Sequence, residues 1–271
     1  MKTLGPRTAR LVEALHDGDG TVFTVADAAR ILDVPANIAS NLLAKAQARG
    51  VVTRLRRGLF TLVPFEMGSA TSHGGDPWQV VDRLLADRPH YFSHGTAMSI
   101  HGMTRQPRLL VTASAVAPKV RHGTAGGHPF RIVGIRPDEI FGIEERWMPG
   151  GLRLPVSDIE RTVVDCLRRP ELAGGYIEID AGAWMVRDRI RPDRLVEHAL
   201  HLGVGAVIAR TGYLLDSCGI GTDNHREALS ARLTRTFHRL DPVLPDEGRH
   251  LSRWRLRLNV ETEEIEAARS T

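Results

Sequence analysis

The sequence is poor in cysteine, because only Cys166 and Cys218 occur among its 271 residues, and they form no CxxC pair. Two thiols so far apart cannot build a framework of several disulfides, and they cannot supply the paired cysteines of a structural zinc site. We therefore expect both cysteines to be buried as small apolar side chains, and we expect no metal ligand among them.

Long apolar stretches are absent too. No run of apolar residues approaches the roughly 18 to 20 that a helix needs to cross a bilayer. The first residues, MKTLGPRTARLVEALHDG, lack the continuous apolar core and small-residue cleavage site of a secretory signal. We therefore expect a cytoplasmic protein with no membrane contact.

Lysine is rare, since it occurs only at Lys2, Lys45 and Lys119, so arginine carries nearly all of the positive charge. The formal net charge is +4, a mild excess that permits an anionic partner without specifying one. Apolar residues make up 42% of the chain and charged residues 25%, as in ordinary globular proteins. At about 150 residues per domain, the length favours two domains.

The N-terminal part carries the pattern of three short helices. Apolar residues at helical spacing predict a helix over residues 8–15, which the glycines of HDGDG end. Thr24, followed by Asp27, predicts the capped start of a second helix. Pro35 favours a sharp corner and the first turn of a third helix, which we expect over residues 36–49.

Residues 51–64, VVTRLRRGLFTLVP, indicate two short strands that meet at an arginine-rich turn. Alternation places Arg54 and Arg56 on one face of the first strand, and Gly58 supplies the permissive residue of a tight turn. The residues expected to face inward are Val51, Leu55, Phe60 and Leu62.

Three short helices followed by a basic hairpin are the order of elements in a winged helix-turn-helix. In such a module the third helix enters the major groove of DNA, and the hairpin contacts the neighbouring phosphate backbone. We expect four apolar residues of the third helix to face inward: Ile38, Leu42, Leu43 and Ala46. The opposite stripe of this helix is then exposed to the duplex.

Short polar side chains on that stripe suit base edges, because asparagine can bond adenine bidentately, whereas lysine and arginine suit phosphates. The predicted DNA-binding residues are Asn37, Ser40, Asn41, Lys45, Arg49, Arg54, Arg56 and Arg57. The alternative interpretation is a small helical unit whose polar face is solvated or contacts a protein. The order of helices, corner and basic hairpin favours DNA, and no further cofactor is indicated.

Composition changes after the hairpin, because FEMGSATSHGGDP is rich in Gly, Ser and Thr and has almost no periodic apolar signal. We therefore expect a DNA-binding domain over residues 1–65, a linker over 66–76 and a second domain over 77–271. Alternating segments early in the second domain predict strands, and several helices follow them. Near the end of the chain, RWRLRLNVE predicts a further strand. The predicted class is α+β, with an N-terminal winged helix-turn-helix and a larger mixed α/β C-terminal domain.

Four strings of the second domain occur in a recognisable order: YFSHGTAMSIHGM, LPVSDIERTVVDCLRRPELAGG, GAVIARTGYLLDSCG and DEGRHLSRWRLRLNV. Together they resemble the C-terminal domain of AbiEi-type antitoxins, the regulators of type IV toxin–antitoxin and abortive-infection systems. The resemblance spans nearly the whole chain, since that family also begins with a winged helix-turn-helix. It implies a repressor that binds inverted repeats at the promoter of its own operon and counters a nucleotidyltransferase-like toxin.

A metal-dependent nuclease fused to a DNA-binding module is the sharpest alternative, because acidic residues gather at Asp158, Glu160, Asp165, Glu178 and Asp180. The string YIEIDAGAWMVRDR offers no lysine to accompany its carboxylates. The first acids stand at a predicted helix start, where Ser157 and Glu160 match a capping box. We therefore expect no enzyme activity and no catalytic residue.

Two histidine pairs have helical spacing, His94 with His101 and His198 with His201, but no third ligand is evident for zinc. We expect these side chains to be solvated or locally hydrogen-bonded. GVGAVI lacks the third glycine of a dinucleotide fingerprint, so the sequence predicts no bound nucleotide cofactor.

The charged residues Arg161, Asp165, Arg168 and Arg169 are expected to form a solvated helix face, with contact to a toxin as the alternative. A repressor that responds to a small molecule stays open as a third hypothesis. With aromatic residues at only 5% of the chain, the sequence shows no aromatic cage for such a ligand.

Overall fold

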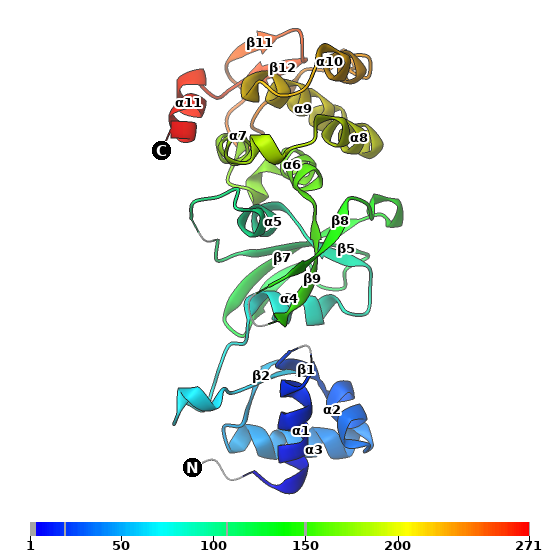
Figure 1. Ribbon diagram of the computed structural model, residues 1–271, viewed down its shortest axis with the longest axis vertical. Helices are drawn as coiled ribbons and strands as arrows, with labels where there is room; N and C mark the ends of the chain where they lie inside the picture. Colours follow the sequence, from blue (N-terminus) through cyan, green and yellow to red (C-terminus); the bar gives the residue numbers. More distant parts are fainter. Residues whose placement is uncertain (1–3, 19, 107, 149–150, 271) are drawn as a thin grey trace.

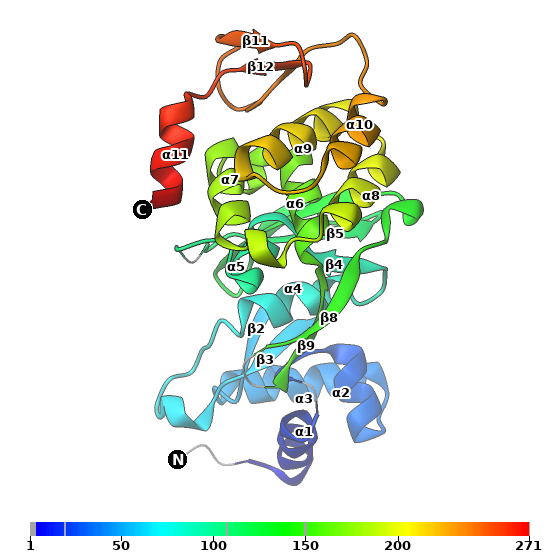
Figure 2. The same ribbon diagram turned by 45° about the horizontal axis from the view of Figure 1, so that its top comes forward.

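The computed structural model describes residues 4–18, 20–106, 108–148 and 151–270. Figure 1 shows three parts along the longest axis: N-terminal helices at one end, a β-sheet in the middle, and helices with a small sheet at the other end. The turned view of Figure 2 keeps the same order. Within the described residues the chain is a mixed α/β protein with three sheets.

The N-terminal part contains the three helices and the hairpin that the sequence predicts. In chain order its elements are α1 (Pro6–His16), β1 (Val22–Thr24), α2 (Val25–Leu32), α3 (Ala36–Ala48), β2 (Val52–Arg56) and β3 (Leu59–Leu62). The predicted cap of α2 is confirmed, because Thr24 Oγ1 accepts a hydrogen bond from Asp27 N at 3.1 Å, and Thr24 N donates to Asp27 Oδ2 at 2.9 Å.

Strand β3 lies between β1 and β2, and both pairings are antiparallel. Gly58 makes the hairpin turn at a φ of +80°, a left-handed conformation that glycine adopts without a steric penalty. The pairing shifts between Arg54 and Arg56, which lie opposite Phe60 and Leu59. A bulge therefore interrupts the alternation that the sequence predicts for these two arginines.

A hydrophobic core of its own holds the N-terminal helices together, with Leu11 and Leu43 fully shielded from solvent. On α3 the buried side chains are Ala39, Leu43 and Ala46, four and three residues apart along one stripe. The prediction that Ile38 faces inward is wrong, since 39% of its surface is exposed. Ile38 precedes the start of the buried stripe by one residue, and it lies at the edge of the exposed face.

The middle of the molecule is a six-stranded mixed sheet with the order β6-β7-β5-β4-β9-β8. Its elements are α4 (Pro77–Leu85), β4 (His90–Phe92), α5 (His94–His101), β5 (Val111–Val116), β6 (His122–Ala125), β7 (His128–Ile135), β8 (Ile143–Trp147) and β9 (Arg153–Ser157), with short 3-10 turns at Phe65–Met67 and Pro137–Glu139. Strands β5 and β7 pair in parallel, as do β4 and β9. Val22 and Leu59 of the N-terminal sheet belong to the hydrophobic core of this central sheet, which also contains Phe92 and Phe130.

The far end is helical. Its elements are α6 (Ile159–Arg168), α7 (Tyr176–Met185), α8 (Pro192–Leu202), α9 (Gly205–Cys218), α10 (Asp223–Ser230), β10 (His238–Arg239), β11 (Arg249–Leu251), β12 (Leu256–Leu258) and α11 (Thr262–Ser270), with 3-10 turns at Pro170–Leu172 and Arg187–Arg189. Both cysteines are free and buried, as predicted, in the core of these helices. Trp254 is also buried there, and its ring lies so close to Gly212 that no side chain fits between them.

One local prediction about this end is confirmed only in part, and another is wrong. The alternating string RWRLRLNVE forms a strand only over Leu256–Leu258, because a turn precedes it and Arg255 has a φ of +52°. Helix α6 is capped by Asp158, whose Oδ1 accepts from Arg161 N at 2.7 Å, rather than by Ser157. The Ser157 hydroxyl instead bonds the Thr162 hydroxyl at 2.7 Å.

Candidate nucleic-acid interface

The predicted DNA-binding residues of the third helix lie together on the outer face of α3. Because Ala39, Leu43 and Ala46 occupy the inner stripe, the remaining turns of the helix point their polar side chains outward. The exposed predicted residues are Asn37, Ser40, Asn41, Lys45 and Arg49, the last at the C-terminal cap. In Figure 1, α3 lies at the end of the molecule farthest from α11 and β11.

A groove runs between this face and the start of α1. It has a volume of about 580 Å³, and cationic and polar side chains line it together with the apolar Ile38 and Leu42. Asn41, Lys45 and Arg49 come from α3, and Arg7 comes from the first turn of α1. Arg7 was not among the predicted residues. Its position directly after Pro6 at an exposed helix start is the signal that points to it.

The side chains of this face are available for a ligand. Asn37 Oδ1 accepts a local hydrogen bond from Ile38 N at 2.9 Å, which leaves its amide group able to donate. Within the described part of the chain, no hydrogen bond or ion pair engages the side chains of Asn41, Lys45 or Arg49. These groups therefore keep their hydrogen-bonding capacity for a partner.

The three hairpin arginines separate into two environments. Arg54 and Arg57 are exposed, and Arg54 Nε makes only a long contact of 3.4 Å to Arg56 O. Arg56 is half-buried and lines a second hollow of about 330 Å³ between the hairpin and the central sheet. The structure therefore brings the α3 residues together, and it places Arg56 in a different hollow.

This second hollow is basic. Arg56 shares it with Arg83, Arg88 and Lys119, whereas Asp87 is its one acidic lining residue among those described. Arg88 Nε and Lys119 Nζ lie 2.8 and 2.9 Å from the Asp87 carboxylate, and their hydrogen bonds hold its pKa well below its usual range. Sequence reasoning missed these cations because the fold brings them to the hairpin from distant segments.

The acidic residues of the nuclease alternative do not converge. Asp158 bonds His198 Nε2 at 3.2 Å, and although burial raises its pKa, that hydrogen bond and the one from Arg161 N lower it below the usual value. Glu160 accepts a hydrogen bond from Arg191 N at 2.7 Å.

The two acids of α7 are equally separate. Asp180 is fully buried and accepts from Arg269 Nε at 2.7 Å, whereas the Glu178 side chain is 51% exposed. Among the described residues, no group of three histidine, cysteine, aspartate or glutamate side chains is placed to hold a metal ion.

The prediction that the charged residues of α6 form a solvated face is wrong for two of the four residues. Arg161 and Asp165 are buried, with 0% and 2% of their surfaces exposed. Arg161 lies over the ring of Phe141, with its central carbon 4.0 Å from the ring centroid, and donates to the Tyr91 hydroxyl at 2.7 Å. Helix α6 packs against the central sheet and the C-terminal helices, which shuts Arg161 and Asp165 off from solvent. The side chains of Arg168 and Arg169 on the same face stay 28% and 40% exposed.

All four histidines form hydrogen bonds, but only His94 bonds a neighbour in the sequence, and only His201 is exposed. His94, His101 and His198 are buried. His101 Nε2 contacts Ser157 O at 2.6 Å, and His94 Nδ1 contacts Ser93 Oγ at 2.8 Å. Burial, to which Arg169 and Arg161 add against the pull of Asp165, lowers the pKa of His94 to about 4.

No helix in the described ranges is both long enough and apolar enough to cross a membrane. No protein-family model matches the sequence, and no curated protein matches it either. Among solved structures, the chain is similar to the crystal structure of the RV2827C protein from Mycobacterium tuberculosis, with a TM-score of 0.72 and 16% sequence identity. The match covers 100% of this chain and 97% of that one. At this identity the likeness shows a shared fold along the whole chain.

Proposed function

We propose that this chain is a DNA-binding transcriptional repressor whose N-terminal part is a winged helix-turn-helix. The observation that carries the proposal is the exposed polar and basic face of α3, at a free end of the molecule. The element order α1-β1-α2-α3-β2-β3, with β3 between the other two strands, is that of a winged helix and supports the same assignment.

The chemistry of the face suits a duplex. An α-helix fits the major groove, where asparagine can bond adenine through two hydrogen bonds, so Asn37, Ser40 and Asn41 are assigned to base edges. Lys45 and Arg49 lie near the end of the same helix, and Arg7 lies across the groove, so these cations are assigned to backbone phosphates. The exposed Arg54 and Arg57 of the hairpin would contact the adjacent backbone.

The resemblance to AbiEi-type antitoxins extends the proposal. In this role the chain works in the cytoplasm, binds inverted repeats at the promoter of its own operon and counters a nucleotidyltransferase-like toxin encoded beside it. The central sheet and the C-terminal helices are then the part assigned to restraint of the toxin.

DNA binding is tested by fluorescence anisotropy with a duplex from the promoter of the chain's own operon and a shuffled duplex of the same composition. We expect promoter affinity about 1,000-fold above that for the shuffled duplex. Lys45→Gln combined with Arg49→Gln should weaken binding to both duplexes. The control Arg235→Gln, an exposed change in the segment between α10 and β10, should leave both affinities unchanged. Equal affinity for the two duplexes would contradict the proposal.

The antitoxin role needs its own test. The reading frame beside the gene is expressed alone and together with this chain, and growth is followed. We expect arrest in the first case and growth in the second. Continued arrest in the presence of the chain would reject the antitoxin role and leave the DNA-binding proposal standing.

A further inference from the structure

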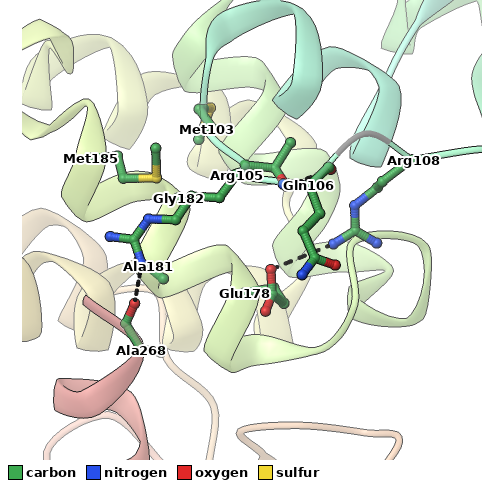
Figure 3. Close-up of a pocket in the computed structure, with 10 residues that line it drawn as sticks. Met103, Arg105, Gln106, Arg108, Glu178, Ala181, Gly182, Met185 and Ala268 are labelled. Carbon is green, nitrogen blue, oxygen red and sulfur yellow. Dashed lines mark hydrogen bonds and ion pairs between the residues drawn. The ribbon is translucent and has the colours of Figure 1, made fainter. Parts of the chain in front are cut away.

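A hollow lies between the segment that follows α5 and one face of α7 (Figure 3). Its volume is about 460 Å³, within the range of roughly 300 to 1,000 Å³ typical of small-molecule sites. Ala268, in the last turns of α11, closes one side. Three segments far apart in sequence therefore form its walls.

The apolar part of the wall is well defined. Met103 is buried, and Ala181 and Met185 of α7 also line the hollow. Gly182 lets α7 approach closely, because a Cβ there would lie 2.4 Å from Met103 O. Close packing of the backbone therefore fixes the position of this wall, which favours a hollow that is already formed without a ligand.

The charged part of the wall has more positive than negative groups. Arg105 and Arg108 both line the hollow, and Glu178 is its one acidic residue among those described. The Arg108–Glu178 distance is 3.8 Å and the Glu178 side chain is 51% exposed, so this pair is loose. Arg105 donates to Ala268 O and Arg269 O at 3.5 and 3.3 Å, and no carboxylate of the described chain pairs with it.

The guanidinium of Arg108 also has unused capacity. One of its terminal nitrogens donates to Ala173 O, but its buried Nε has no hydrogen-bond partner in the described part of the chain. Buried donors without acceptors are rare in folded proteins and mark places where a partner is missing. Figure 3 shows the Arg105 side chain pointing toward Ala181 and Ala268, and the Arg108 side chain pointing toward Glu178, on either side of the Gln106 side chain.

We propose that this hollow binds a small organic anion, a carboxylate or phosphate ester with an apolar body. The acid group would bond the Arg105 guanidinium, and Arg108 would add positive charge on the other side of Gln106. The apolar body would lie against Met103, Ala181 and Met185. The Gln106 side chain would add a hydrogen bond. This site is independent of the DNA interface.

The proposal is tested by fluorine NMR titration with 4-fluorobenzoate, 4-fluorophenyl phosphate and the neutral 4-fluorobenzamide. We expect at least one of the two anions to bind at least about ten-fold more tightly than the amide. Arg105→Gln should remove this preference. Ala181→Phe, which fills the apolar side, should weaken all three probes, and Arg235→Gln should change nothing. Thermal unfolding of each variant confirms that it is folded.

Two results would overturn the assignment. One is equal binding of the anions and the amide, or no binding of any probe up to about 5 mM. The other is an anion preference that persists in folded Arg105→Gln and Ala181→Phe proteins, since the anions would then bind elsewhere.

Discussion

Arg161 Nη2 lies 3.0 Å from Asp165 Oδ1, one turn apart on α6, and both side chains are shut off from solvent. The Tyr91 hydroxyl donates to Asp165 Oδ2 at 3.1 Å and so joins the pair to the central sheet. Burial, together with the charge of Asp165, raises the pKa of Tyr91, so this hydroxyl stays protonated and acts as a donor. The ion pair therefore connects the middle of the molecule to its helical end.

Loss of one charge from this pair should be costly. Asp165→Asn leaves the Arg161 guanidinium buried without its counterion, and we expect the free energy of unfolding to fall by about 3 to 5 kcal/mol. Glu144→Gln, which alters the exposed ion pair with Arg146, is the matched control and should cost less than about 1 kcal/mol. Urea denaturation measures both, and similar losses for the two variants would argue against a structural role for the buried pair.

Stability should depend on pH through His94. Its folded pKa of about 4 lies below the ordinary 6.5, so between these values the unfolded chain binds more protons and acid favours unfolding. Stability should therefore rise from pH 4.5 to 6.5, with His94 contributing roughly 2 to 3 kcal/mol of that rise. His94→Asn, which suits the φ of +52°, should flatten the slope in pH-dependent denaturation. An unchanged slope would show that other groups cause it.

Gly212 should tolerate no side chain. An added Cβ would lie 2.2 Å from the ring of Trp254, which is itself buried, so Gly212→Ala should destabilise the fold by about 1 to 3 kcal/mol. Gly205→Ala in the same helix is the control, because its nearest contact would be the His238 ring at 3.3 Å. Thermal melts of the two variants should differ clearly, and equal melting temperatures would contradict this packing.

The hairpin arginines should contribute unequally to salt-dependent binding. Each lost phosphate contact reduces the slope of log affinity against log salt by about 0.9, so Arg54→Gln and Arg57→Gln should each lower it by up to that amount. Arg56→Gln should lower it less, since Arg56 faces the hollow beside Arg83. Anisotropy titrations over a salt series measure the slopes. Slopes that match the unaltered protein in all three variants would remove the hairpin from the interface.

Features governed by neighbouring residues were predictable from the sequence. Thr24 and Asp27 cap a helix because they are three residues apart, and Gly58 adopts the left-handed conformation that the tight turn between β2 and β3 requires. The exposed stripe of α3 follows from helical periodicity, so its polar residues were predictable as a set. Ile38 was not, because its exposure depends on how α3 sits against α1.

Features that depend on distant contacts were not predictable. Arg161 and Asp165 are charged residues of the kind that usually lie on a surface, and they are buried because the fold places Tyr91 and Phe141 against them. Arg83 and Lys119 join Arg56 through the packing of the central sheet against the hairpin. The anion hollow likewise needs α7, α11 and the segment after α5 to meet, and no local pattern marks that meeting.

The most direct test of the central claim, that α3 reads DNA, is the effect of Asn41→Ala on promoter and shuffled duplexes in anisotropy titrations. We expect a loss of about 1 to 3 kcal/mol on the promoter duplex alone, with little change on the shuffled one. Asn224→Ala, an exposed asparagine on α10, is the matched control and should leave both affinities unaltered. Equal losses on the two duplexes, or none on either, would contradict base reading by Asn41.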